Sequence, residues 1–104
     1  MSMYSLALVS CPDVDTAATI GRTVVKERLA ACATVIPGVE SIYWWEEKVK
    51  ESREALLLLK TRSSLFKRLE KVIAANHPYS VPEILSFKIE EGYTPYLKWI
   101  DKET

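Results

Sequence analysis

Residues 55–61, "ALLLLKT", are almost wholly apolar, and this run decides the fold. A strand with one solvent-exposed face alternates apolar and polar residues, whereas here consecutive positions are apolar. The run therefore predicts a strand buried on both faces. Residues 39–45, "VESIYWW", predict another strand before it, and the charged residues 46–54, "EEKVKESRE", suit an exposed hairpin tip. We expect the two strands to form a long antiparallel hairpin.

The elements on either side complete a familiar order. Residues 4–10 are a short apolar run that predicts a strand, and Asp13 is a good N-cap for the helix that follows. That helix is expected to carry apolar residues at helical spacing as far as Leu29 and Cys32. Further elements are a strand over 34–36 that a Pro37-Gly38 bend interrupts, a helix from Ser63 or Ser64 to Asn76, a strand over 83–90, and a short helix that Thr94 caps.

This order is β-α-β-β-α-β with a terminal helix. It predicts a single α+β domain, residues 1–104, with the ferredoxin-like split βαβ arrangement. Two helices on one side of a four-stranded sheet leave the other side uncovered. Because soluble monomers rarely expose a large apolar patch, we expect another subunit to cover most of that side. The terminal helix can cover only part of it.

The composition argues against several functional classes. Fourteen basic residues balance fourteen acidic ones, so the chain lacks the charge typical of nucleic-acid or anionic-membrane binding. It has no apolar run of the roughly 18 to 20 residues that span a bilayer. Its start does not resemble a signal peptide, and we expect a cytoplasmic protein. The two cysteines, Cys11 and Cys32, are then expected to be thiols.

One loop stands out as a candidate site. Residues 76–84, "NHPYSVPEI", contain the only histidine, His77, and two prolines that stiffen the backbone around Tyr79 and Glu83. We expect the loop to line a cleft between subunits, with His77 protonated at the end of a helix. Lys60, Trp45 and Glu46 end neighbouring strands, so they are expected to converge on the same cleft. The alternative is structural, with Glu83 and Lys60 as an ion pair and Tyr79 packed at the subunit seam.

Several spaced motifs together resemble the CutA divalent-cation-tolerance family. They are "ERLAACATVIPGVESIYWWEEKV" at 27–49, "LLLLKTRSSLFKRL" at 56–69, "HPYSVPEI" at 77–84 and "YLKWI" at 96–100. The resemblance implies a ferredoxin-like fold in a compact homotrimer similar to that of PII signalling proteins. It also implies a role in tolerance to divalent metals, above all copper.

The resemblance points to His77 as a metal ligand. Some relatives carry a second histidine where this chain has Asn76, and some carry a cysteine where it has Val9. Because both are missing here, we expect copper(II) to bind weakly, through His77 with Cys11 as a weak second ligand.

No catalytic motif is present. Three glycines make a phosphate-binding loop improbable, and no nucleophile is paired with a base by any known spacing. We therefore expect a binding protein and not an enzyme. Two alternatives stay open: a PII-like sensor of a small anionic ligand at the subunit clefts, and a stable scaffold.

Overall fold

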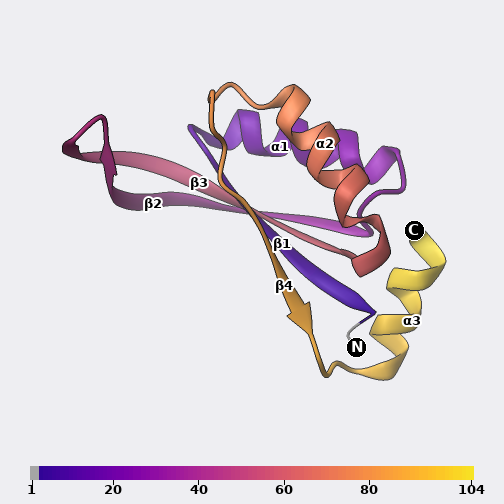
Figure 1. The fold of residues 1–104 in the computed structure, drawn as a ribbon. Helices are drawn as coiled ribbons and strands as arrows, with labels where there is room; N and C mark the ends of the chain where they lie inside the picture. Colours follow the sequence, from indigo (N-terminus) through magenta and orange to yellow (C-terminus); the bar gives the residue numbers. More distant parts are fainter. Residues whose placement is uncertain (1–2) are drawn as a thin grey trace.

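Four antiparallel strands form one sheet in the order β2-β3-β1-β4, with α1 and α2 on one of its faces (Figure 1). The computed structural model describes residues 3–104, so Met1 and Ser2, at the start of the expected domain, lie outside it. The strands are β1 (Tyr4–Cys11), β2 (Cys32–Trp45), β3 (Lys48–Arg62) and β4 (Ile84–Ile89), and the α-helices are α1 (Val14–Lys26), α2 (Phe66–Asn76) and α3 (Thr94–Glu103). The predicted element order is confirmed.

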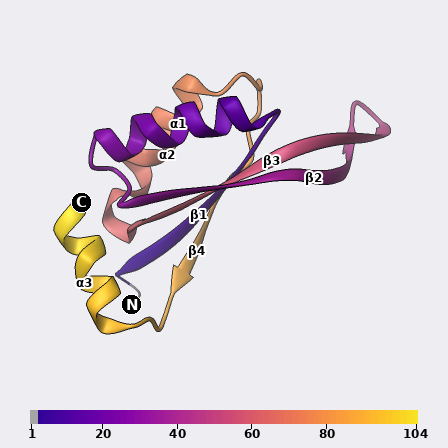
Figure 2. The same cartoon turned by 180° about the vertical axis from the view of Figure 1, so that it is seen from behind.

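The core lies between the sheet and the first two helices, as the view from behind also shows (Figure 2). Alternate residues of the two central strands, Val9 and Leu57 among them, are fully buried against Ile20 of α1 and Leu69 of α2. Gly21 lets α1 approach closely, since a Cβ there would lie 3.0 Å from the Cβ of Ala33. The apolar run at 55–61 thus lies in β3, one of the two central strands of the sheet.

Helix α1 ends earlier than the apolar spacing predicts. Arg28 adopts a left-handed conformation with φ of 61°, which turns the chain out of the helix. The N–H of Leu29 then donates to the carbonyl of Val24, and that of Arg28 to Val25, which is the Schellman pattern. The expectation that Leu29 and Cys32 extend the helix is wrong, because Leu29 closes the core beyond it and Cys32 begins β2.

Of the three predicted helix N-caps, one is confirmed and two differ from the prediction. Asp13 does cap α1, accepting from the N–H of Thr16 at 2.7 Å. Neither Ser63 nor Ser64 caps α2, because a 3-10 turn (Ser63–Leu65) leads into that helix. Helix α3 has Tyr93 at its N-cap, with no side-chain cap, so Thr94 is its first residue.

The hairpin is longer and more regular than expected. Residues 48–54 belong to β3 and not to a loose tip, since the turn consists of Glu46 and Glu47 alone. Both have positive φ, 50° and 64°, which matches a two-residue type I′ turn. Residues 39–54 pair only with each other, beyond the end of β1, and project from the sheet (Figure 1). We call residues 39–54 the arm.

The sheet face opposite α1 and α2 is apolar, as predicted. Cross-strand register places Leu8 beside Leu58 on β3 and Leu85 on β4. Leu85 is 47% exposed and Phe87 50% exposed. Helix α3 covers one end only, where Asp101 accepts from the Tyr4 hydroxyl at 2.7 Å. Within residues 3–104, no helix has the length and apolarity needed to cross a membrane.

Candidate functional site

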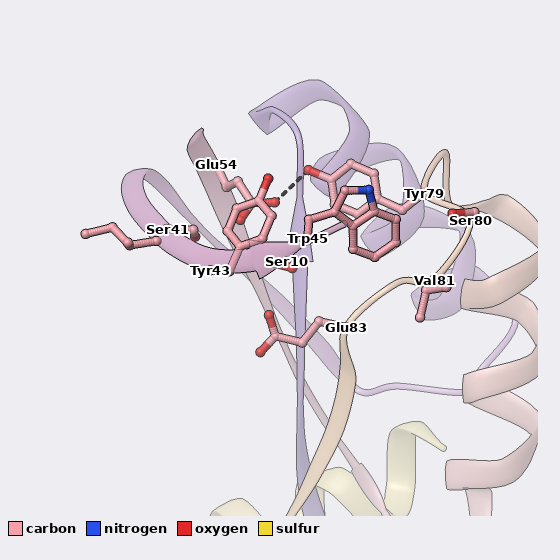
Figure 3. A pocket seen from close by; sticks show the side chains of 10 residues that line it. Ser10, Ser41, Tyr43, Trp45, Glu54, Tyr79, Ser80, Val81 and Glu83 are labelled. Atoms are coloured by element: carbon pink, nitrogen blue, oxygen red, sulfur yellow. Dashed lines mark hydrogen bonds between the residues drawn. The ribbon is translucent and has the colours of Figure 1, made fainter. Parts of the chain in front are cut away.

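A cleft of about 610 Å³ opens between the arm, the end of β1 and the loop after α2 (Figure 3). Each of these three segments contributes side chains, so the cleft depends on the way the arm leaves the sheet. Its lining residues are Ser10, Ser41, Ile42, Tyr43, Trp45, Glu54, Tyr79, Ser80, Val81 and Glu83. Of the predicted site residues, the structure brings together Tyr79, Glu83 and Trp45.

A hydrogen bond between Tyr79 and Glu54 joins the two sides of the cleft. The Tyr79 hydroxyl donates to Glu54 Oε2 at 2.6 Å (Figure 3). Glu54 is only 8% exposed, although it sits on the arm, because Tyr79 lies against it. Burial raises the pKa of Tyr79 well above its usual value, and the bond to Glu54 raises it further. Tyr79 is therefore a stable donor to this carboxylate.

His77 supports this arrangement from behind instead of facing the cleft. Its Nε2 lies 2.7 Å from the carbonyl of Ser10, and its Nδ1 accepts from the N–H of Tyr79 at 3.1 Å. With Nδ1 as the acceptor, Nε2 is the nitrogen that donates to the Ser10 carbonyl. The ring also packs 4.8 Å from that of Tyr79. His77 was expected to face the cleft, but it is not among the lining residues, and its imidazole links β1 to the loop.

The predicted metal ligands are not available in this arrangement. Both nitrogens of His77 are already hydrogen-bonded. Cys11 is fully buried, and burial, with Glu54 nearby, raises its pKa to about 11, so it is not a thiolate at neutral pH. No cluster of three or more histidine, cysteine, aspartate or glutamate side chains that could hold a metal occurs among residues 3–104.

Cys11 should therefore react very slowly with thiol reagents. At pH 8, a pKa of about 11 leaves roughly one thiol in a thousand ionised, and the side chain is also shielded. We expect the Cys32→Ser variant, which retains only Cys11, to show almost no labelling by a disulfide-exchange reagent until it is unfolded. The Cys11→Ser variant, which retains the partly exposed Cys32, is the control. Rapid labelling of native Cys11 would contradict the buried placement.

Two predicted site residues lie elsewhere. The Lys60 ammonium donates to Thr34 Oγ1 at 2.8 Å, and its strand position pairs with Leu6, well along the sheet from the cleft. Glu46 is in the turn at the far tip of the arm. The alternative Lys60–Glu83 ion pair is likewise not among the ion pairs of residues 3–104.

Sequence reasoning missed Glu54 and Tyr43. Glu54 was assigned to a charged tip, although it immediately precedes the buried run at 55–61, where a carboxylate needs a partner. Tyr43 lies two residues before Trp45 on the same face of β2, and its hydroxyl is 3.1 Å from Ser52 Oγ. Both could have been found by extending the strand pattern through 48–54.

Comparison with known proteins identifies the family. The family model described as "CutA1 divalent ion tolerance protein" matches residues 5–103. The chain belongs to this CutA1 family. A curated relative, the divalent-cation tolerance protein CutA of Thermus thermophilus, is 43% identical over 98% of this chain and 99% of its own length. The resemblance seen in the sequence motifs is thereby confirmed.

Solved CutA1 structures share the fold. The Thermus thermophilus protein superposes with a TM-score of 0.95 at 43% identity, covering 98% of this chain and 99% of that one. The Archaeoglobus fulgidus protein, described as periplasmic, has a TM-score of 0.94 at 32% identity, with 97% and 98% covered. The zebrafish CutA homolog is 45% identical over 93% of this chain, but the chain spans only 65% of that protein's length.

Proposed function

We propose that this CutA-family chain contributes to divalent-cation tolerance by binding, as a homotrimer in the cytoplasm, and that it catalyses no reaction. Family membership supports the role in cation tolerance. The single structural observation that carries the rest is the apolar sheet face opposite α1 and α2, which one chain cannot cover.

The apolar face and the arm both favour association. Phe87 and Leu85 are about half exposed on that face, and α3 reaches only its end near Tyr4. The arm is an isolated two-stranded ribbon, which is marginally stable in water without something to pack against. It carries the strongly exposed side chains of Ile42 and Trp44, which are 69% and 73% exposed. Neighbouring copies that pack on the face and the arm would bury both.

Binding fits the chemistry of the cleft better than catalysis does. A histidine acts as a general base only through a free acceptor nitrogen within reach of a nucleophile. His77, the only imidazole, has Nδ1 occupied by the N–H of Tyr79 and Nε2 by the Ser10 carbonyl. The buried thiol of Cys11 is held protonated. These side chains are committed to holding the loop in place.

Cation binding would use more than one chain. Copper(II) prefers imidazole and thiolate ligands, but His77 and Cys11 are both engaged or shielded within the chain. We propose that copper or another divalent cation binds weakly, with ligands completed across subunits. A stable scaffold is the second candidate, favoured by the extensive burial of the core. The anionic-ligand alternative loses support because the cleft has two carboxylates, Glu54 and Glu83, and no lysine or arginine.

Light scattering on a sizing column, followed by copper titration of the same sample, tests this proposal. We expect a mass near 35 kDa, three times the 11.8 kDa of one chain, and a weak heat of copper binding in calorimetry. A mass near 11.8 kDa would exclude the trimer. Tight zinc or copper binding in a monomer would exclude ligands shared between subunits.

A further inference from the structure

The cleft is acidic and aromatic at once. Its carboxylates are Glu54 and Glu83, and its lining includes no cationic side chain. The ion pairs among residues 3–104 use Glu40, Glu70 and Glu103, so neither cleft carboxylate has a lysine or arginine partner there. The local field in the cleft therefore favours a positively charged guest.

Aromatic rings make up much of the remaining wall. Tyr43 and Trp45 come from the arm and Tyr79 from the loop, and the three rings gather around one space with the two carboxylates on either side of it as drawn (Figure 3). Ring faces attract cations, and tryptophan does so most strongly. Ile42 and Val81 add an apolar surface at the edge. A guest with a charged head and an apolar body would satisfy every part of this wall.

The wall is also held in a fixed shape. The Tyr79 hydroxyl donates a hydrogen bond to Glu54 at 2.6 Å. The backbone N–H of Tyr79 donates to Nδ1 of His77, which fixes the backbone of the loop at that point. A cleft that keeps its shape before binding loses less conformational entropy when a ligand enters. Its volume of about 610 Å³ lies within the usual range for small-molecule sites.

We propose that this cleft binds a small organic cation, one with an ammonium group on an apolar body. An inorganic divalent ion suits it less, because such ions require several oxygen ligands at short distance and no cluster of three or more candidate ligands occurs among residues 3–104. An anion would be repelled by the two carboxylates of the cleft, Glu54 and Glu83. All ten lining residues belong to one chain, so the site needs no residue from a neighbouring copy, and the proposal does not rest on the role in metal tolerance.

Calorimetry on the intact protein with three aromatic probes of similar size tests the proposal. The probes are benzyltrimethylammonium, which is cationic, benzyl alcohol, which is neutral, and phenylacetate, which is anionic. We expect the cation to bind at least tenfold more tightly than either of the others. Equal or tighter binding of phenylacetate, or no binding of the cation at millimolar concentration, would overturn the proposal.

Matched variants locate the binding site. Glu83→Gln removes one exposed carboxylate of the cleft, and Trp45→Leu removes a ring face, which should weaken cation binding roughly threefold to thirtyfold. The controls are Glu51→Gln and Trp44→Leu, which alter a carboxylate and a ring on the same arm outside the cleft lining. Mass and thermal unfolding of each variant show whether it is still folded and assembled. Equal weakening by the control and cleft variants would place the cation elsewhere and overturn the proposal.

Discussion

Replacing Leu58 by glutamate is expected to convert the proposed trimer into monomers. Leu58 lies in the middle of the apolar sheet face, paired across the strands with Leu8 and Thr34. If a neighbouring copy covers this face, a carboxylate there loses its water without gaining a partner, at a cost of several kcal/mol for each subunit. Light scattering should show the mass fall from about 35 kDa to that of one 11.8 kDa chain.

Lys71→Glu is the control for this experiment. Lys71 is exposed on α2, on the opposite side of the molecule from the apolar face, so the change alters charge without touching the proposed interface. We expect that variant to keep the mass of the unmodified protein. Circular dichroism should show that the Leu58→Glu variant remains folded, because the core on the helix side is unchanged. A folded Leu58→Glu trimer would mean that the sheet face is not the interface.

Replacing His77 by alanine is expected to lower the free energy of unfolding by about 2 to 4 kcal/mol. The change leaves the Ser10 carbonyl and the Tyr79 N–H without their partner, and each buried unsatisfied group costs about 1 to 3 kcal/mol. The 9% exposed ring also leaves a cavity beside Tyr79. Urea unfolding at one fixed protein concentration measures the effect, since assembly makes stability depend on concentration.

Asn76→Ala provides the comparison. Asn76 precedes His77, is exposed, and donates its amide only to the Val72 carbonyl of its own helix at 2.8 Å. Its removal should change the free energy of unfolding by about 0.5 kcal/mol or less. If His77→Ala proved as mild as Asn76→Ala, the imidazole would not be the link between β1 and the loop.

The sequence predicted the fold well because the fold depends on local patterns. The apolar runs at 4–10 and 55–61 predicted the two central strands of the sheet, and Asp13 indicated where α1 begins. The errors occurred where a residue adopts a backbone conformation that its type rarely adopts. Arg28, Glu46 and Glu47 all have positive φ although none is glycine or asparagine. Because those two residue types are the usual sequence indicators of such turns, the sequence did not indicate a turn at these positions.

The site was harder to predict because it depends on the geometry of the arm. Tyr79, Glu83 and Trp45 line one cleft within a single chain, whereas the sequence predicted a cleft between subunits. Glu54 was assigned to a loose tip because the two-residue turn was not recognised, and that assignment hid its bond to Tyr79. Lys60 was expected at the cleft, although cross-strand register, which cannot be read from one strand alone, pairs it with Leu6 and Cys32.

The tight turn of the arm also constrains how this part of the chain can change in evolution. Successive residues of a strand face opposite sides, so one inserted or deleted residue reverses the sides for every position that follows. Ahead of Tyr43, such a shift would turn Tyr43 and Trp45 out of the cleft and bring Trp44 in. Changes in arm length therefore keep this aromatic wall when they lie beyond Trp45, at the turn, or when they add or remove an even number of residues ahead of Tyr43.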